Sequence, residues 1–157
     1  MQVTNHRAVI GNYLARRICE MLQTTEAPSI RICSVGCGDG QLDKLVLLKV
    51  LEKHPKANIE VLGVDINDLS CQKANEHLGQ VSRQHAQVKI KVVSGDILDV
   101  IAAEEGVFDA VIVVHTMYYI KDLEKVLKKL LELQKPSGMS SFLIVPSFCI
   151  VACHVYR

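Results

Sequence analysis

Short apolar runs alternate with segments of helical period along most of the chain, and this alternation limits the fold more than any other feature. Each run is too short for a helix and is apolar at nearly every position, which is typical of a strand buried on both faces. Strands separated by helices predict a doubly wound α/β fold, with a parallel sheet covered on both sides. We expect strands at 30–35, 59–64, 88–93, 108–114 and 141–145, and helices at 9–22, 42–53, 69–84, 98–103 and 122–133.

Composition and charge limit the function classes. The chain has 157 residues, of which 49% are apolar, and this argues for one folded domain and against disorder. Its formal net charge is +1, so it has no basic field for nucleic acid, and we expect a small-molecule partner. We divide the chain into an N-terminal helical segment (1–29), a cofactor-binding core (30–145) and a divergent tail (146–157).

The six cysteines and the uncharged C-terminal stretch both have a simple interpretation. No two cysteines have CxxC spacing, which argues against a zinc ribbon or a redox motif, and we expect no metal. Free thiols and a polar N-terminus without a signal peptide favour a cytoplasmic protein.

Residues 136–156 contain no Asp, Glu, Lys or Arg, but Pro146 interrupts their short apolar runs. We therefore expect a buried strand there and no membrane span.

The loop after the first strand carries the most informative motif, Val35-Gly36-Cys37-Gly38-Asp39-Gly40. Its glycines let the backbone approach a ligand closely, and the following helix offers free N–H groups. A dinucleotide fingerprint needs glycine at the position of Gln41, and Asp39 would repel a pyrophosphate. The loop therefore favours a phosphate-free ligand with an amino-acid group over NAD. A strand-to-helix turn without any ligand is the alternative.

Polar residues also follow the next three strands, at the edge where open parallel sheets bind ligands. Asp65 can accept hydrogen bonds from two ribose hydroxyls. Asp96 can accept from an exocyclic amine or cap the next helix, and Ile97 can pack on a ring. His115 is a candidate ligand contact or base, with a structural polar residue as the alternative.

Together, these motifs resemble the class I S-adenosylmethionine-dependent methyltransferase family over about residues 30–145. The resemblance implies a Rossmann-like fold, S-adenosyl-L-methionine as cofactor and methyl transfer as activity. Within the family, residues 34–43 and 117–122 look like the histamine N-methyltransferases, which implies N-methylation of a small, histamine-like amine. The implied cofactor contacts are Gly36, Gly38, Gly40, Asp65, Ser70, Asp96, Ile97, Val114 and His115.

The resemblance implies a less complete substrate site. Asn5 stands where the histamine N-methyltransferases have an amine-binding glutamate, and their C-terminal asparagine has no counterpart here. Those enzymes also have Glu at the position of Asp65. Tyr118 is expected to line the acceptor pocket. No catalytic residue is assigned, because a neutral imidazole nitrogen needs no proton removed before it attacks a methyl group.

The chain ends soon after the fifth predicted strand, whereas the class I fold continues with a helix and an antiparallel pair of strands. We therefore expect a fold without these C-terminal strands, an unpaired strand-five edge open to self-association, and weak cofactor binding without turnover. Alternatively, residues 148–156 extend or replace a strand. A non-catalytic cofactor-binding or regulatory module is the second functional hypothesis.

Overall fold

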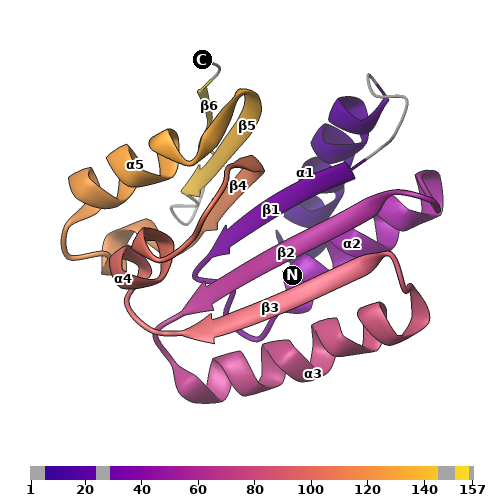
Figure 1. Cartoon of the computed structure of the whole chain (residues 1–157), viewed down its shortest axis with the longest axis horizontal. Coiled ribbons are helices and arrows are strands. Elements are labelled where there is room, and N and C mark those ends of the chain that lie inside the picture. Colours follow the sequence, from indigo (N-terminus) through magenta and orange to yellow (C-terminus); the bar gives the residue numbers. More distant parts are fainter. Residues whose placement is uncertain (1–5, 24–28, 145–150, 156–157) are drawn as a thin grey trace, which may run out of the picture.

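The computed structural model describes residues 6–23, 29–144 and 151–155, and the side chains of residues 6–23 and 29–135. Its centre is a six-stranded sheet with the order β3-β2-β1-β4-β5-β6 (Figure 1). The first five strands are parallel, and β6 is antiparallel to β5. The strands are β1 (Ser29–Val35), β2 (Asn58–Asp65), β3 (Val88–Ser94), β4 (Phe108–Val114), β5 (Gln134–Ile144) and β6 (Val151–Val155).

Helices cover both faces of the sheet, which confirms the predicted α/β architecture. One face carries α1 (His6–Leu22), α2 (Gln41–Lys53) and α3 (Asp68–Gln84), and the other carries α4 (Ile97–Ala102) and α5 (Leu123–Glu132). A short 3-10 helix, η1 (Met117–Tyr119), lies between β4 and α5.

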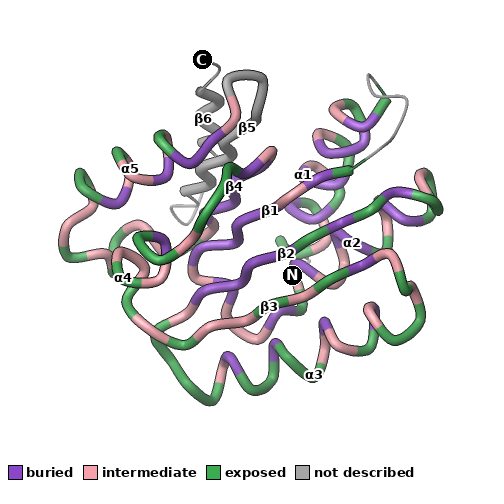
Figure 2. The backbone as a smooth tube through the Cα atoms, in the orientation of Figure 1, coloured by how far each residue is buried: buried purple, intermediate pink, exposed green. Residues whose placement is uncertain are grey.

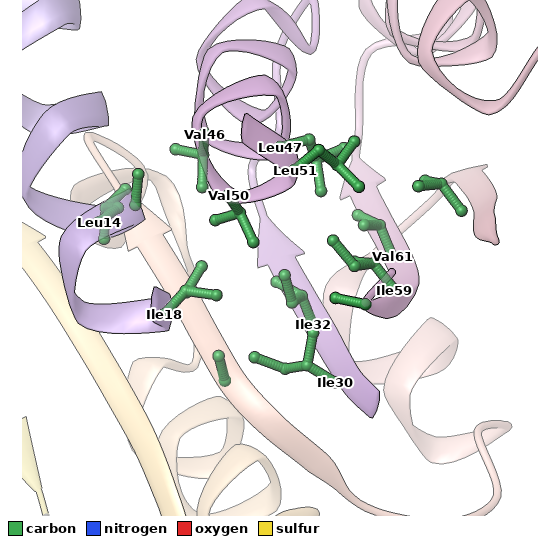
Figure 3. Packing of buried hydrophobic residues seen from close by; sticks show 14 of the residues in the cluster. Leu14, Ile18, Ile30, Ile32, Val46, Leu47, Val50, Leu51, Ile59 and Val61 are labelled. Carbon is green, nitrogen blue, oxygen red and sulfur yellow. The ribbon is translucent and has the colours of Figure 1, made fainter. Parts of the chain in front are cut away.

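The strands bury side chains on both faces because successive residues point to opposite sides. In β1, Ile30 and Ile32 join the core under α1 and α2, whereas Cys33 and Val35 join the core under α4 and α5. Figure 3 shows the first core, where Ile18 and other residues of α1 and α2 pack against β1. Most residues of β1, β2 and β4 are buried, while the edge strand β3 is largely half-buried or exposed (Figure 2).

The fifth strand differs from its prediction. It begins at Gln134, seven residues before the predicted start at 141, so it includes the Pro-Ser-Gly segment at 136–138. Phe108 pairs with Gln134, but Ala110 pairs with Met139, so β5 advances five residues while β4 advances two. The Pro-Ser-Gly segment therefore interrupts the register without ending the strand.

The expectation of an unpaired strand-five edge is wrong. Residues 140–144 of β5 pair with β6, in a register that runs from Ser140 opposite Val155 to Ile144 opposite Val151. The alternative, in which the tail supplies a strand, describes the sheet better. Pairing satisfies the backbone groups that would otherwise make β5 an association site.

Candidate functional site

A first cavity of about 520 Å³ opens where β1, β2, β3 and β4 end. In Figure 1, the arrowheads of β1, β2 and β3 point to the same edge of the sheet, near α4. Every segment that follows one of these four strands contributes to the cavity wall. Its lining residues are Val35, Gly36, Val64, Asp65, Ile66, Gly95, Asp96, Ile97, Leu98, Val114, His115, Thr116, Tyr119, Ile120, Lys121, Asp122 and Val126.

The three glycines of the glycine loop between β1 and α2 have different surroundings, so each is needed for a different steric reason. A Cβ on Gly36 would overlap the Thr116 side chain, so this glycine lets the β4 loop approach the glycine loop. A Cβ on Gly40 would lie 2.9 Å from the Cα of Ala74, so this glycine lets α3 approach. A Cβ on Gly38 would meet nothing within 4 Å, and the residue has a φ of 55°, which favours glycine. Gly38 is thus the loop position that faces open space.

Asp65 is held in place by two backbone amides. Gly38 N–H donates to its Oδ2 and Asn67 N–H donates to its Oδ1, both at 2.9 Å. A carboxylate has about four acceptor positions, so Asp65 retains acceptor capacity at the cavity wall. The structure therefore adds a role that the sequence did not indicate, since Asp65 also orients the glycine loop.

Asp96 both caps a helix and lines the first cavity. Its Oδ1 accepts a hydrogen bond of 2.9 Å from Leu98 N–H at the start of α4. Ile97 and Leu98 lie beside it and give this part of the wall an apolar surface. The two interpretations of Asp96 that the sequence left open are compatible.

The segment after β4 forms the wall shared with the glycine loop. Among the described residues, His115 is the only non-glycine with a positive φ, 56°, a conformation that such residues seldom adopt. Thr116 Oγ1 donates to Val114 O at 2.9 Å, which tightens this turn. Tyr119 lines the first cavity, whereas Tyr118, the tyrosine expected there, does not. Their ring centroids are 4.5 Å apart.

A second cavity of about 390 Å³ lies on the other side of the glycine loop, beside α1 and α2. It shares part of its wall with the first cavity, so the two meet along β1 and β4. Its lining residues are His6, Arg7, Ile10, Ser34, Val35, Gly36, Cys37, Gly38, Asp39, Leu42, Asp43, Ile112, Val114 and His115.

Asp43 is the unusual group of the second cavity. It lies in the first turn of α2 and is only 5% exposed. Burial raises its pKa to about 6, although a hydrogen bond from the Ser34 hydroxyl opposes the rise. Sequence reasoning assigned no role to Asp43. The sequence nevertheless contains an indication that Asp43 is buried. It lies at helical spacing from Val46, Leu47 and Val50, which form the buried stripe of α2.

Among the described residues, three of the predicted site residues line neither cavity, namely Gly40, Ser70 and Tyr118. Gly40 serves the packing of α3, and Ser70 N–H donates to the capping side chain of Asn67 at 2.9 Å. Neither residue lines the two cavities. Asn5 lies outside the described residues.

The described residues include neither a metal-binding cluster nor a membrane-spanning helix. Within those ranges, no group of three or more His, Cys, Asp or Glu side chains could hold a metal ion. No helix among the described segments has the length and apolar character needed to cross a membrane.

Comparison with known sequences identifies a family over most of the chain. Residues 33–140 match the family model described as a methyltransferase domain. No curated protein sequence matches the chain.

Solved methyltransferase structures have the same fold. The plantazolicin methyltransferase BpumL in complex with SAH matches with a TM-score of 0.64 and 15% identity, over 88% of this chain and 48% of BpumL. S-adenosyl-L-homocysteine complexes from Geobacter sulfurreducens and Thiobacillus denitrificans have TM-scores of 0.57 and 0.55, with identities of 15% and 16%. Each of these two matches covers 83% of this chain and 47% of the other. The chain thus spans about half the length of these structures.

Proposed function

Because the chain belongs to the methyltransferase-domain family, we propose that it binds S-adenosyl-L-methionine across both cavities and transfers the methyl group to a small amine. The observation that carries this proposal is the meeting of the two cavities. Val35, Gly36, Val114 and His115 line both of them. Such a pair suits a ligand with two different ends, and this cofactor joins adenosine to an amino acid through a sulfonium.

The first cavity suits the adenosine end. Asp65 is fixed by backbone amides and has acceptor capacity left for ribose hydroxyls. Asp96 can accept from the exocyclic amine of adenine, and Ile97 can pack on the ring. In this arrangement, the polar groups of the sheet edge set the orientation and the apolar residues supply contact area.

The charge of the first cavity favours a cationic ligand over a phosphate. Asp65, Asp96 and Asp122 contribute carboxylates to the wall, although Asp122 also pairs with Lys125 at 2.6 Å. Among the described residues, Lys121 is the only lysine or arginine of this wall. A sulfonium and a protonated amine are both attracted by such a wall, and a pyrophosphate is repelled. The same balance argues against a nicotinamide dinucleotide.

For the reaction itself, the chain needs mainly to orient an acceptor. When bound, the cofactor would supply a methyl carbon activated by its sulfonium, with S-adenosylhomocysteine as the leaving group. Correct orientation of two reactants is worth roughly 7–11 kcal/mol. His115 and Tyr119 lie at the shared wall and the first cavity, respectively, and are the residues we propose to hold the acceptor.

The proposal of a small amine acceptor rests on sequence resemblance and on the charge of the first cavity. Residues 34–43 and 117–122 resemble the histamine N-methyltransferases, and Tyr119 belongs to the second of these segments.

The cysteines support the location that we propose, the reducing cytoplasm. The structure describes buried free thiols at Cys19, Cys33, Cys37 and Cys71.

A methyl-transfer assay tests the proposed function. The purified chain is incubated with S-adenosylmethionine and either histamine or a panel of small amines, and methylated products are separated by chromatography. The sequence predicts no turnover, partly because strand five would have an unpaired edge, and the pairing of β5 with β6 removes that reason. We therefore expect methylated amine, with loss of product in Asp65→Ala and retention in the matched variant Asp99→Ala, which changes an exposed aspartate that lines neither cavity. Cofactor binding without product from any amine would favour a non-catalytic cofactor-binding module.

A further inference from the structure

Asp43 is a buried carboxylate that has no cationic partner among the described residues. Its hydrogen bonds come from the Ser34 hydroxyl and from its own backbone amide. The charged group that acts on it most is Asp39, which is also negative and raises its pKa. The site therefore concentrates negative charge in a place that water hardly reaches.

Burial of an unpaired carboxylate is unfavourable, and proteins usually compensate it with a cation. Here the compensation from the chain is small. The start of α2 contributes its dipole and free N–H groups, but Asp43 still has a pKa near 6. Because Asp43 lines the second cavity, a ligand in that cavity can supply the missing positive charge.

The other residues of the second cavity indicate which cation is suitable. Arg7 reaches the cavity from α1, and its guanidinium makes one long hydrogen bond, 3.4 Å, to Gln41 Oε1. An arginine on the wall provides donors for a carboxylate. A cavity with a buried carboxylate and an arginine has the charge pattern of a receptor for a zwitterion.

We propose that Asp43 binds the α-ammonium of the cofactor's amino-acid end, with Arg7 positioned for the α-carboxylate. This inference rests on the proposed function. It means that Asp43 recognises the positive charge of the α-ammonium, which the adenosine part of the cofactor does not carry. Asp43 is then a specificity-determining residue, because it distinguishes the complete cofactor from fragments without the amino acid.

The proposal predicts pH-dependent binding with a definite sign. Asp43 must be ionised to attract an ammonium, so affinity rises as the pH increases through about 6 and then levels off. Histidines also change charge near neutral pH, so the difference between wild type and Asp43→Asn isolates the contribution of Asp43. The titratable or polar groups that share the wall of the second cavity with Asp43 are Ser34 of β1, Cys37 and Asp39 of the glycine loop, His6 and Arg7 of α1, and His115 after β4. Cys33 lies nearby on the opposite face of β1.

Calorimetric titration with two ligands tests the proposal. S-adenosylhomocysteine carries the amino-acid end, and 5′-methylthioadenosine lacks it. At pH 8, we expect Asp43→Asn to weaken S-adenosylhomocysteine binding roughly 10- to 100-fold and to leave 5′-methylthioadenosine binding unchanged. Asp99→Asn, the same change at an exposed site outside both cavities, should alter neither dissociation constant.

Each outcome has a clear meaning. Unchanged binding of S-adenosylhomocysteine by Asp43→Asn, or equal loss of both ligands, overturns the assignment. If wild type binds neither ligand, the proposed function fails, and the assignment fails with it. If the variant does not fold, wild type is titrated with the S-adenosylhomocysteine analogue that lacks the amino group, and affinity equal to that of S-adenosylhomocysteine contradicts the proposal.

Discussion

The two cavities present negative charge in opposite ways. In the first, Asp65, Asp96 and Asp122 are half-buried or exposed, and Asp65 and Asp96 accept hydrogen bonds from backbone amides. In the second, Asp43 is 5% exposed and has Asp39 as its negative neighbour. The carboxylates of the first cavity remain solvated or hydrogen-bonded without a ligand, whereas Asp43 bears the cost of burial.

Carboxylates of the two kinds differ in how they affect ligand binding and the stability of the unliganded protein. Solvated carboxylates can accept hydrogen bonds from a ligand, and they lower the stability of the unliganded fold little. A buried carboxylate gives a stronger interaction with a ligand cation, but it destabilises the empty protein. We therefore expect changes in the first cavity to affect every adenosine ligand, and changes in the second to affect only ligands with an amino-acid end.

The largest effect is expected from Gly38→Val. The new side chain enters open space that lines only the second cavity, and it forces valine into a positive φ. S-adenosylhomocysteine binding should weaken by at least about 100-fold, while 5′-methylthioadenosine binding changes less, as measured by calorimetry.

Gly106→Val is the matched control for Gly38→Val. Gly106 also has a positive φ, 86°, and lies outside both cavities. It should lower the thermal stability without weakening the binding of S-adenosylhomocysteine. Normal cofactor binding by Gly38→Val would mean that the glycine loop is only a structural turn.

Asp65→Ala is the corresponding test in the first cavity. We expect both adenosine ligands to bind about 30- to 150-fold more weakly, which is about 2–3 kcal/mol. The variant also loses the bonds from Gly38 and Asn67, so its free energy of unfolding should fall by about 1–2 kcal/mol. Equal dissociation constants for wild type and variant would remove Asp65 from the ligand site.

Asp43→Asn should stabilise the unliganded protein at alkaline pH. The pKa of Asp43 is about 6 in the folded protein and 3.8 as the ordinary value. A raised folded-state pKa gives stability that is complete below the ordinary pKa and is lost as the pH rises through the folded value. The asparagine variant avoids this loss, so its advantage in urea denaturation should grow from near zero at pH 4 to about 1–3 kcal/mol at pH 8. An advantage that does not change with pH would contradict this account of Asp43.

The smallest effect distinguishes two adjacent tyrosines. Tyr119 lines the first cavity and Tyr118 does not, although both are well exposed. Tyr119→Ala should weaken S-adenosylhomocysteine binding about 2- to 5-fold through lost contact area, and Tyr118→Ala should have no measurable effect. The opposite order would restore Tyr118 to the position that the sequence indicated.

Much of this architecture follows from local patterns in the sequence. The central strands are continuous apolar runs because both of their faces are covered, so β1, β2 and β4 were predicted within a residue or two. The glycine loop, Asp65 and Asp96 follow these strands directly, and their positions at the sheet edge were predictable.

The features that the sequence did not predict depend on contacts between segments that lie far apart along the chain. The second cavity needs α1 to lie beside the glycine loop, and no local pattern places Arg7 there. Asp43 was visible as a polar residue in an apolar stripe, but its burial depends on β1 and α2 together. The pairing of β6 with β5 is likewise a contact between two strands, and the composition of the tail did not specify it.

Calorimetric titration of the unmodified chain with S-adenosylhomocysteine and NAD, under identical conditions, shows directly which kind of cofactor the chain binds. The glycine loop, with Asp39 and Gln41, and the acidic wall of the first cavity favour the phosphate-free ligand. We predict saturable binding of S-adenosylhomocysteine and no heat of binding from NAD. Binding of NAD at least as tight as that of S-adenosylhomocysteine would contradict the account.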